Sequence, residues 1–390
     1  MEQRGDAECR RRRGGDPAGG SPPPSCPSPL EGEGTSWPTP VRLLAPSVLV
    51  RLVAAIMRGA GCADEEASTV ARRLVDSNLV GHDSHGVIRV GKYLEWVHAG
   101  WIRPNQPPSV VFDSDTMAII DGNRGFGQVV GEFAGNLGTR KAAKSGIAMV
   151  GLRNCGHLGR VGDWAELAAA KGQVSLHFLN TSGAQRVAPF GGSDRRLSTN
   201  PITIGIPVSG GDPVIVDITT SMVAEGKLFV ASNKGEQVPA GWIVDKDGKA
   251  TTDPDDFYAG GALLTVGAHK GSGLSIAVDL LAGAISTGKS SDPYDTVLRN
   301  NMLSIYISPQ VYDTEGKVAD EVTRFLQWVK ASPPATPGQP VLLPGEVERA
   351  SRSLRSAQGI PVEDKTWEDL VAAAESVGIS AAAAEKMIGS

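Results

Sequence analysis

The sequence predicts a mixed α/β protein in which helices from the two ends of the chain come together as a second domain. Short apolar runs separated by turn residues fill the chain between about residues 109 and 309, which is typical of strands alternating with helices. Apolar residues at helical spacing dominate residues 46–98 and 319–388 instead. No glycine-rich fingerprint of a doubly wound parallel sheet accompanies the strands, so that fold is not predicted.

Composition and patterning divide the chain into four predicted parts. Residues 1–45 contain the basic run Arg10–Arg13 followed by glycine, proline and serine, with too little apolar material to fold, so they are predicted to be a disordered tail. The others are an N-terminal helical part (46–112), a mixed α/β domain (113–289) and a mostly helical C-terminal part that packs with the N-terminal helices (290–390).

The individual elements follow from the spacing of apolar residues and from the turn residues between them. Helices are predicted at 46–58, 64–79, 93–98, 128–145, 163–171, 270–287, 319–330, 346–358, 367–377 and 381–388. Two strands are predicted within 109–122, and further strands at 146–154, 174–180, 201–208, 213–218 and 301–309. A hairpin is predicted at 242–251, with Asp247 and Gly248 as its turn.

Bulk composition excludes several classes of protein. The 390 residues carry a formal net charge of −5 and only 5% aromatic residues, which argues against a nucleic-acid partner. The four cysteines form no CxxC pair, so neither a disulfide framework nor a zinc site is expected, and a reducing cytoplasm is the simplest location. No apolar run approaches the ~18 residues of a membrane helix.

Histidines beside glycine are the strongest candidates for chemistry. His82 and His85 lie in "GHDSHGV", His157 lies in "NCGHLGRVG" and His269 lies in "GAHKGSG". Histidine exchanges protons near neutral pH, and neighbouring glycines let a ligand approach the backbone closely. A metal site at His82 and His85 lacks a third ligand at a supporting spacing, and a nucleophile at Cys155 is separated from His157 by a single glycine. Neither alternative is favoured.

Polar residues at the end of a predicted apolar strand form a second candidate. Asp217, Thr219, Thr220 and Ser221 follow "VIV", where hydroxyls and backbone amides could cap the next helix or hold a phosphate. The sequence leaves these two interpretations open.

Several segments together resemble the malate/L-lactate dehydrogenase family, from about residue 46 to the C-terminus. They are "GHDSHGV", "CGHLGRVG", "VAPFGG", "TNP", "VDITTS" and "GAHKGSGL". The segments "RGFGQVV", "VPAGWIVDKDGKATTDP" and "QGIP" are most similar to the hydroxycarboxylate dehydrogenase B branch. Ser272 departs from the family, which often has an aromatic residue there, and residues 181–189 contain one residue more than many relatives. Both differences bear on the shape of the substrate pocket.

The resemblance implies a homodimer that carries NAD or NADP, with NAD favoured, on a mostly antiparallel sheet that is not a Rossmann fold. It implies hydride transfer between the nicotinamide and C2 of a small 2-hydroxy or 2-oxo acid of the malate, lactate, 2-hydroxyglutarate or aryl-lactate type. His157 would exchange the hydroxyl proton, His85 would lie beside the nicotinamide, and Asp217 would orient a histidine or meet the cofactor. Arg89 or Arg160 would pair with the substrate carboxylate.

The family's cofactor contacts carry over onto residues spread along the chain, and no metal is implied. They are His85, Gly159, Arg160, Val161, Ile215, Val216, Asp217, Ile218, Thr219, His269, Lys270, Asn300, Gly345, Glu346, Val347 and Glu348, with Lys270 as a phosphate partner.

Three other functions remain as alternatives. A reductase of cyclic ketimines such as piperideine-2-carboxylate would use the same hydride donor but protonate nitrogen. A non-catalytic scaffold would be expected to lose His157 or the "HKG" segment, and both are present. A metal hydrolase would be sensitive to chelators.

Overall fold

The computed structural model describes residues 41–388, so most of the predicted tail lies outside the described residues. The prediction that the tail continues to residue 45 is wrong at its end. Strand β1 (Val41–Leu44) pairs antiparallel with β12 (Ile360–Glu363), and Leu44 is buried. A strand this short, paired with residues more than 300 positions away, leaves no local periodicity in the sequence.

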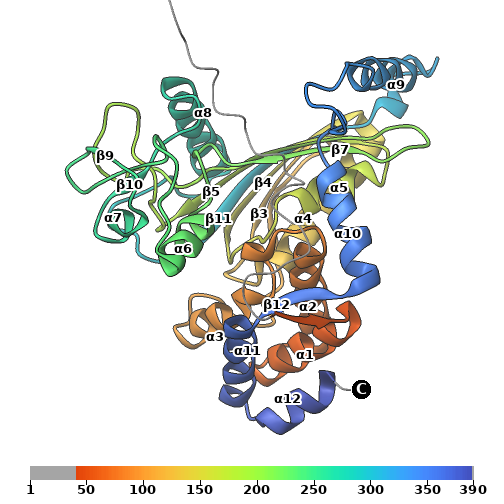
Figure 1. Cartoon of the computed structure of the whole chain (residues 1–390). Coiled ribbons are helices and arrows are strands. Elements are labelled where there is room, and N and C mark those ends of the chain that lie inside the picture. Colours follow the sequence, from red (N-terminus) through yellow and green to blue (C-terminus); the bar gives the residue numbers. More distant parts are fainter. Residues whose placement is uncertain (1–40, 389–390) are drawn as a thin grey trace, which may run out of the picture. The chain divides into compact units, whose positions relative to one another are not determined.

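Helices from both ends of the chain share one hydrophobic core, as the predicted fold class requires (Figure 1). The N-terminal ones are α1 (Pro46–Gly59), α2 (Asp64–Leu79) and α3 (Val90–His98), and the C-terminal ones are α11 (Asp364–Ser376) and α12 (Ala381–Ile388). Leu49, Leu52 and Ile56 follow helical spacing in α1 and pack in the same cluster as Trp367 and Leu370. The boundaries of the predicted domains stay predictions.

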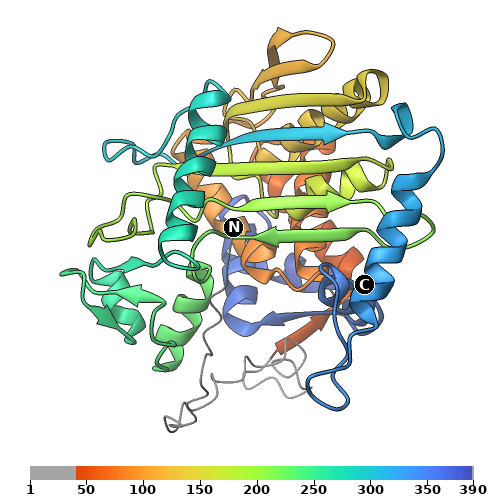
Figure 2. The ribbon, with the colours of Figure 1, turned by 90° about the horizontal axis from the view of Figure 1, so that it is seen from above.

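A seven-stranded sheet forms the centre of the mixed α/β part (Figure 2). Its strands, in spatial order, are β2 (Ser109–Asp113), β3 (Met117–Asp121), β4 (Ile147–Cys155), β11 (Arg299–Ile307), β5 (Val174–Ser182), β6 (Ile202–Ile206) and β7 (Val214–Ile218). Only β3 and β4 run parallel; every other neighbouring pair in this sheet is antiparallel. The prediction of a mixed α/β fold with a mostly antiparallel sheet is therefore confirmed.

One face of the sheet is covered by α4 (Gly127–Ser145) and α5 (Gly162–Ala169). Glycines in α4 bring the helix backbone close to its neighbours. A Cβ at Gly131 would lie 2.4 Å from the Trp164 ring, and a Cβ at Gly138 would lie 2.2 Å from the Tyr306 ring. These contacts fix the start of α4, which adjoins the candidate site.

The opposite face contacts α8 (His269–Asp279) and the π-helix Leu280–Ile285 that follows it. The sequence predicted one helix over 270–287, whereas the α-helical hydrogen bonding ends at Asp279. In Figure 2, α8 crosses the strands near one of their ends, and in Figure 1, α10 (Glu346–Gln358) lies at the opposite end of the sheet from α8.

The remaining elements form a small lobe beside the sheet and a separate helix. The predicted hairpin is confirmed as β8 (Ile243–Val244) and β9 (Ala250–Thr251), to which β10 (Ala262–Leu263) adds a third strand. Helices α6 (Glu225–Lys234) and α7 (Pro254–Tyr258) were not predicted, while α9 (Lys317–Lys330) was. None of the helices among residues 41–388 is both long and apolar enough to cross a membrane.

Candidate active site

Two of the predicted histidines lie face to face. His85 ends a short 3₁₀ helix (Asp83–His85), and His157 lies in the loop that follows β4. Their rings stack with centroids 5.5 Å apart and planes inclined by 19°. Both side chains are partly buried. The structure therefore brings together two residues that are 72 positions apart in the sequence.

The loop that carries His157 is held from two sides. The Oδ1 atom of Asn300 accepts a hydrogen bond from the Leu158 amide at 2.8 Å. Gly127, at the start of α4, lies so close that a Cβ there would be 2.2 Å from the His157 carbonyl oxygen. Asn300 also donates to Thr181 Oγ1 at 2.9 Å. Besides the predicted contact with the cofactor, Asn300 therefore has a structural role in holding this loop against β5.

A buried tyrosine and glutamine, neither predicted as site residues, extend from His157 into the core. The Tyr93 hydroxyl lies 2.9 Å from Nδ1 of His157, and Gln128 Nε2 donates to the Tyr93 oxygen at 2.7 Å. Burial raises the pKa of Tyr93 to about 12, so the hydroxyl stays protonated at neutral pH. No local pattern marked them: Tyr93 follows Lys92 in α3, and Gln128 stands in a glycine-rich helix with other polar residues.

Both histidine rings are held in their neutral form. Burial lowers the pKa of His157 well below its ordinary value, and the positive charge of Arg89 and the neighbouring His85 lower it further. Burial, aided by Arg89, lowers the pKa of His85 to about 3. A neutral imidazole can accept a proton from a substrate hydroxyl at pH 7, which the charged ring cannot do.

Arg89 offers a positive charge beside the two histidines. It ends the 3₁₀ helix Val87–Arg89, and its Nε donates to the Ser84 carbonyl oxygen at 2.6 Å. Within residues 41–388, no carboxylate forms an ion pair with its guanidinium. An unpaired guanidinium next to a proton acceptor is suited to binding a carboxylate of the substrate.

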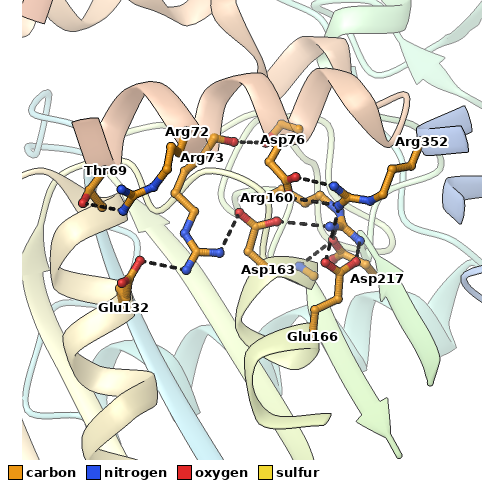
Figure 3. Close-up of polar contacts among 12 residues, drawn as sticks. Thr69, Arg72, Arg73, Asp76, Glu132, Arg160, Asp163, Glu166, Asp217 and Arg352 are labelled. Atoms are coloured by element: carbon orange, nitrogen blue, oxygen red, sulfur yellow. Dashed lines mark hydrogen bonds and ion pairs between the residues drawn. The ribbon is translucent and has the colours of Figure 1, made fainter. Parts of the chain in front are cut away.

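Arg160, the other predicted carboxylate partner, is already occupied (Figure 3). It is 2% exposed, donates to Asp163 at 3.1 Å and to Glu166 at 2.7 Å, and lies 4.0 Å from Asp217. These carboxylates raise the pKa of Arg160 above its ordinary value, against the effect of burial. The structure thus favours Arg89 over Arg160 as the residue free to bind substrate.

Three carboxylates near Arg160 are spaced as metal ligands could be. Oxygen atoms of Asp76, Asp163 and Glu166 lie within 4.8 Å of one another. Arg352 pairs with Asp76, and Arg160 pairs with both of the others (Figure 3). Because guanidinium groups already balance these charges, the cluster is an ion-pair network that fixes α2 against α5 and α10.

His82 and His85, the pair considered as metal ligands, have separate neighbours. His82 Nε2 lies 3.5 Å from Glu348 Oε1 on α10, whereas His85 stacks on His157 and Nδ1 of its ring lies 3.0 Å from Ser84 Oγ. The pair with Glu348 connects the histidine cluster to the predicted cofactor residues 345–348.

Asp217 organises the backbone near Arg160. Its two carboxylate oxygens accept hydrogen bonds from the Gly162 amide at 2.8 Å and from Thr203 Oγ1 at 2.7 Å. Its hydrogen-bond partners in the described chain are thus a backbone amide and a hydroxyl. The role of orienting a histidine receives no support from this geometry.

The predicted cofactor residues follow the edge strand β7 from one end to the other. At its start, the Ile215 amide donates to the Pro344 carbonyl oxygen at 3.3 Å, which places Gly345 beside the strand. At its middle, Asp217 binds Gly162. Beyond its end, the Val266 amide donates to the Thr220 carbonyl oxygen at 3.0 Å, just before His269 begins α8.

We call the predicted cofactor residues along β7 the strip. Their side chains fit a dinucleotide cofactor. Ile218 is 50% exposed and offers an apolar edge to a ring, and His269 and Lys270 are exposed polar groups suited to a phosphate. Gly159 and Gly345 have φ angles of 75° and 94°, which favour glycine and leave the backbone open to a ligand. Val161 and Ile215 are buried, so their side chains belong to the core and only their backbones could contact a ligand.

Other interpretations from the sequence are settled by specific contacts. Cys155 Sγ donates to the Asn300 carbonyl oxygen at 3.2 Å, and burial raises its pKa, so it is not an activated nucleophile. Thr220 donates to the Thr199 carbonyl oxygen, and α6 begins only after Ala224, without a side-chain cap. The helix-capping interpretation of Thr219 to Ser221 is therefore wrong.

The two departures from the family lie next to each other. The Ser272 hydroxyl accepts a hydrogen bond from the Phe190 amide at 2.9 Å, directly after the unusual 181–189 segment. The Phe190 ring in turn lies edge-on to His269, with centroids 5.9 Å apart. Both departures therefore act at the α8 end of the strip.

Comparisons with known proteins identify the family of this chain. Residues 44–371 match the sequence profile of malate/L-lactate dehydrogenases. Hydroxycarboxylate dehydrogenase B of Escherichia coli K12 is 38% identical over 335 residues, covering 84% of this chain and 92% of that protein. A solved Escherichia coli structure, whose assignment as a malate/lactate dehydrogenase is itself provisional, is 36% identical with a TM-score of 0.85, covering 90% of this chain and 100% of the other.

A solved relative with a different named activity has the same fold. The Δ1-piperideine-2-carboxylate reductase of Pseudomonas syringae is 30% identical with a TM-score of 0.76, covering 85% of this chain and 99% of the other. The match of the family profile over most of the sequence decides the assignment. The chain belongs to the malate/L-lactate dehydrogenase family, a family of oxidoreductases that use a nicotinamide cofactor.

Proposed function

We propose that this protein transfers a hydride between a nicotinamide cofactor and C2 of a 2-hydroxy or 2-oxo acid, with His157 as the acid–base group. The observation that carries the proposal is the neutral His157 ring stacked on His85, with Arg89 unpaired beside them. Those groups match two features of the substrate: His157 can remove the hydroxyl proton, and Arg89 can bind the carboxylate.

The residues divide the chemistry between them. Oxidation of the alcohol removes a hydride from C2 and a proton from oxygen, and the bound nicotinamide supplies the hydride chemistry. His157 takes the hydroxyl proton in this direction and returns it to the carbonyl oxygen in the reverse direction. Arg89 holds the carboxylate, and His85 packs against His157 and keeps its ring from rotating.

We propose that the cofactor lies along β7 and that NAD is preferred over NADP. Glu346 and Glu348 begin α10 next to Gly345, and Asp212 lies at the same end of the strip, paired with Arg349. If the adenosine ribose binds at this end, these carboxylates could accept hydrogen bonds from its free hydroxyls and would repel a 2′-phosphate, although Lys330 pairs with Glu346 and His82 lies beside Glu348. Comparing KM for NADH and NADPH tests this preference; a lower KM for NADPH would contradict it.

The second candidate function is reduction of a cyclic ketimine, favoured by the likeness to the Pseudomonas syringae reductase. The same Arg89 could bind the carboxylate of piperideine-2-carboxylate while His157 meets a ring nitrogen in place of oxygen. The two candidates share the hydride step and differ in the atom that is protonated, so only the substrate distinguishes them.

We propose further that a second copy of this chain covers the open side of α8. This helix and its π-helical continuation face the sheet with small and polar residues and expose apolar ones. The inward residues include Ser272, Ser275 and Asp279, and the outward residues, 42–55% exposed, are Leu274, Ile276, Leu280 and Ile285. The exposed run carries no charge, which suits an apolar protein surface better than a polyanion.

Light scattering tests the dimer. The wild-type chain is expected at twice its formula mass, and Ile276→Asp together with Leu280→Asp is expected to give the monomer. A wild-type monomer at micromolar concentration would contradict this part of the proposal.

Buried, unpaired Cys62 and Cys155 support the proposal of a reducing compartment, the cytoplasm.

The absorbance of reduced nicotinamide tests the reaction itself. Purified protein is mixed with NADH or NADPH and with a panel of 2-oxo acids and one cyclic imine. We expect oxidation of NADH with at least one oxo acid. Turnover with the imine alone would favour the second candidate, and no turnover by folded protein across the panel would contradict both.

A further inference from the structure

We propose that a small polar cavity at the ends of β4, β5 and β11 binds a small carboxylic acid that carries an amino or hydroxyl group beside its carboxylate. The cavity has a volume of about 210 Å³, and residues between 287 and 295 complete its wall. None of its lining residues is among the predicted catalytic, cofactor or substrate residues. The inference therefore does not depend on the proposed reaction.

The cavity lies on the opposite face of the sheet from the His157 loop. Neighbouring residues of a strand point to opposite faces. In β11, Asn300 contacts Leu158 of the His157 loop. The residues on either side of it, Arg299 and Asn301, line the cavity instead. The π-helix that follows α8 contacts this same face and leads into the outer wall of the cavity.

Three buried polar atoms around the cavity have no hydrogen-bond partner in residues 41–388. They are Nε of Arg299, Oγ of Ser182 and Oδ2 of Asp295. Arg299 and Ser182 are directly paired in the β5–β11 ladder, and Ser182 is only 1% exposed. Buried polar groups in folded proteins nearly always have a partner. Three such atoms around one cavity therefore indicate a bound group that supplies the missing hydrogen bonds.

The two opposite charges at the cavity do not pair with each other. The Arg299 guanidinium forms no ion pair and no hydrogen bond in the described part of the chain. Oδ1 of Asp295 accepts from the Val297 amide at 3.1 Å, which holds the carboxylate in place. Its Oδ2 lies 3.6 Å from Nζ of Lys289, which lies closer to Asp292, at 3.0 Å. A cationic and an anionic group thus border the cavity, and each has one side open to a ligand.

The second arginine of the cavity, Arg153, already has partners. Its Nε donates to Asp121 at 3.1 Å, and its Nη1 donates to the carbonyl oxygen and the hydroxyl of Thr287 at 3.1 and 2.9 Å. These bonds join β4 to the exposed residues Thr287, Gly288 and Lys289, through which a ligand can enter. Arg153 therefore shapes the cavity, and Arg299 is the group available to bind an anion.

The donors and acceptors at the cavity define the class of ligand. Arg299 can only donate hydrogen bonds, and a carboxylate is the acceptor that best fits a guanidinium. The ionised Asp295 can only accept, so the ligand must also carry a donor. A simple carboxylic acid has no such donor and brings a second negative charge toward Asp295. A 2-amino or 2-hydroxy acid supplies both groups, and the Ser182 hydroxyl can bond to either.

The volume of the cavity limits the size of the ligand. Pockets for drug-sized ligands have volumes of roughly 300–1,000 Å³. The 210 Å³ of this cavity therefore suits an acid of only a few carbon atoms.

A matched series of three-carbon acids tests the ligand class. Racemic alanine and lactate, pyruvate and propionate share one carbon skeleton and differ only in the group on C2. Ligand-observed NMR measures their dissociation constants with the full chain, free of cofactor. We expect alanine or lactate to bind at least roughly 10-fold more tightly than propionate and pyruvate, the value of about one charge-assisted hydrogen bond. Tighter alanine identifies an amino acid as the ligand, and tighter lactate identifies a hydroxy acid. Equal binding of all four acids, or binding of none, would overturn the proposal.

Replacement of Arg299 assigns the binding to this cavity. Arg299→Met keeps an unbranched side chain without the charge, and it is expected to weaken the tighter acid at least roughly 10-fold. Arg89→Ala, in the candidate active site, is the control and should leave that binding unchanged. Undiminished binding in Arg299→Met, or loss of binding in Arg89→Ala, would place the acid elsewhere and overturn the proposal.

Asp295→Asn supplies a second readout if Arg299→Met does not fold. This change keeps the acceptor for the Val297 amide and removes the negative charge. The donor of the ligand then loses a charged partner, while every carboxylate is freed from repulsion. The preference for the tighter acid over propionate is therefore expected to shrink, and an unchanged or larger preference would overturn the proposal. Turnover is not measured in any of these experiments, so failure of this inference and failure of the proposed function are distinguishable.

Discussion

The imidazole rings of His85 and His157 stack with their centroids 5.5 Å apart, and this contact joins two segments that are 72 positions apart in the sequence. His85 ends the 3₁₀ helix that follows α2, and His157 lies in the loop that follows β4. Burial and the positive charge of Arg89 lower the pKa of both rings, and His85 lowers that of His157 further, so the pair stays neutral at physiological pH.

Acid should destabilise the fold through its buried histidines. The pKa of His177 is lowered to about 3 by burial between Ser175 and Ser304, below an unfolded value of about 6.5. Between these two pKa values the folded state binds fewer protons than the unfolded state. The free energy of unfolding is therefore highest above pH ~6.5 and decreases as the pH falls toward ~3. His177 alone contributes a slope of about 1.4 kcal/mol per pH unit in this window.

Urea unfolding between about pH 7 and pH 5 measures this slope. His177→Gln should reduce the slope by the contribution of one histidine. His98→Gln, at an exposed position, is the control and should leave the slope unchanged. A free energy of unfolding in the wild type that does not fall with pH would contradict the buried neutral histidines.

Arg89→Ala should impair binding of the substrate carboxylate. Loss of a charge-assisted, two-point contact is expected to lower kcat/KM by about 10- to 100-fold, chiefly through KM. Arg89→Lys should recover only part, because an ammonium does not form the planar pair of bonds. Steady-state kinetics check this, with Arg103→Ala at an exposed position as the control. An unchanged KM in Arg89→Ala would show that another group binds the carboxylate.

Gly127→Ala should displace the loop that carries His157. The added Cβ would meet His157 backbone atoms at 2.2 and 2.4 Å, and backbone cannot yield as a side chain does. A shift of about 1 Å can cost roughly 100-fold in kcat. Gly91→Ala, in the first turn of α3, is the matched control, because a Cβ there meets nothing within 4 Å and the fold is expected to tolerate it. Equal kcat in the two variants would refute this close packing.

Arg160→Met should destabilise the fold more than it changes the chemistry. Removing this guanidinium leaves Asp163, which is 2% exposed, without its nearest counter-charge, at a cost of about 3–5 kcal/mol. The double change Arg160→Met and Asp163→Leu should restore part of the loss, since both buried charges are then absent. Urea unfolding of the two variants decides this; equal stability of Arg160→Met and wild type would contradict the network.

The sequence was sufficient for the elements that carry their own periodicity. The long helices α1, α2 and α4 and the hairpin of β8 and β9 follow from apolar spacing and turn residues. Pairing of β1 with β12 could not be predicted, because residues 41 and 363 meet only in the folded chain. Helix α7 was missed although Asp253 caps it and Pro254 begins it, because it is only five residues long.

The site was predictable where a residue type alone suggests chemistry. Histidines flanked by glycine pointed to His85 and His157, but nothing local in the sequence joins Tyr93 to His157, 64 positions away. The pairing of Arg160 with carboxylates was visible only in part. Asp163 stands at helical spacing from it, whereas Asp217 reaches it from another strand.

Replacement of His157 tests the central claim most directly. Single-turnover hydride transfer and cofactor binding are measured in parallel for wild type and His157→Ala, with His98→Ala as the exposed control. The proposed acid–base role predicts a loss of about 10²- to 10⁴-fold in the rate of hydride transfer, with the dissociation constant of NADH unchanged. Wild-type rates in folded His157→Ala would contradict that role and, with it, the proposed reaction at this site.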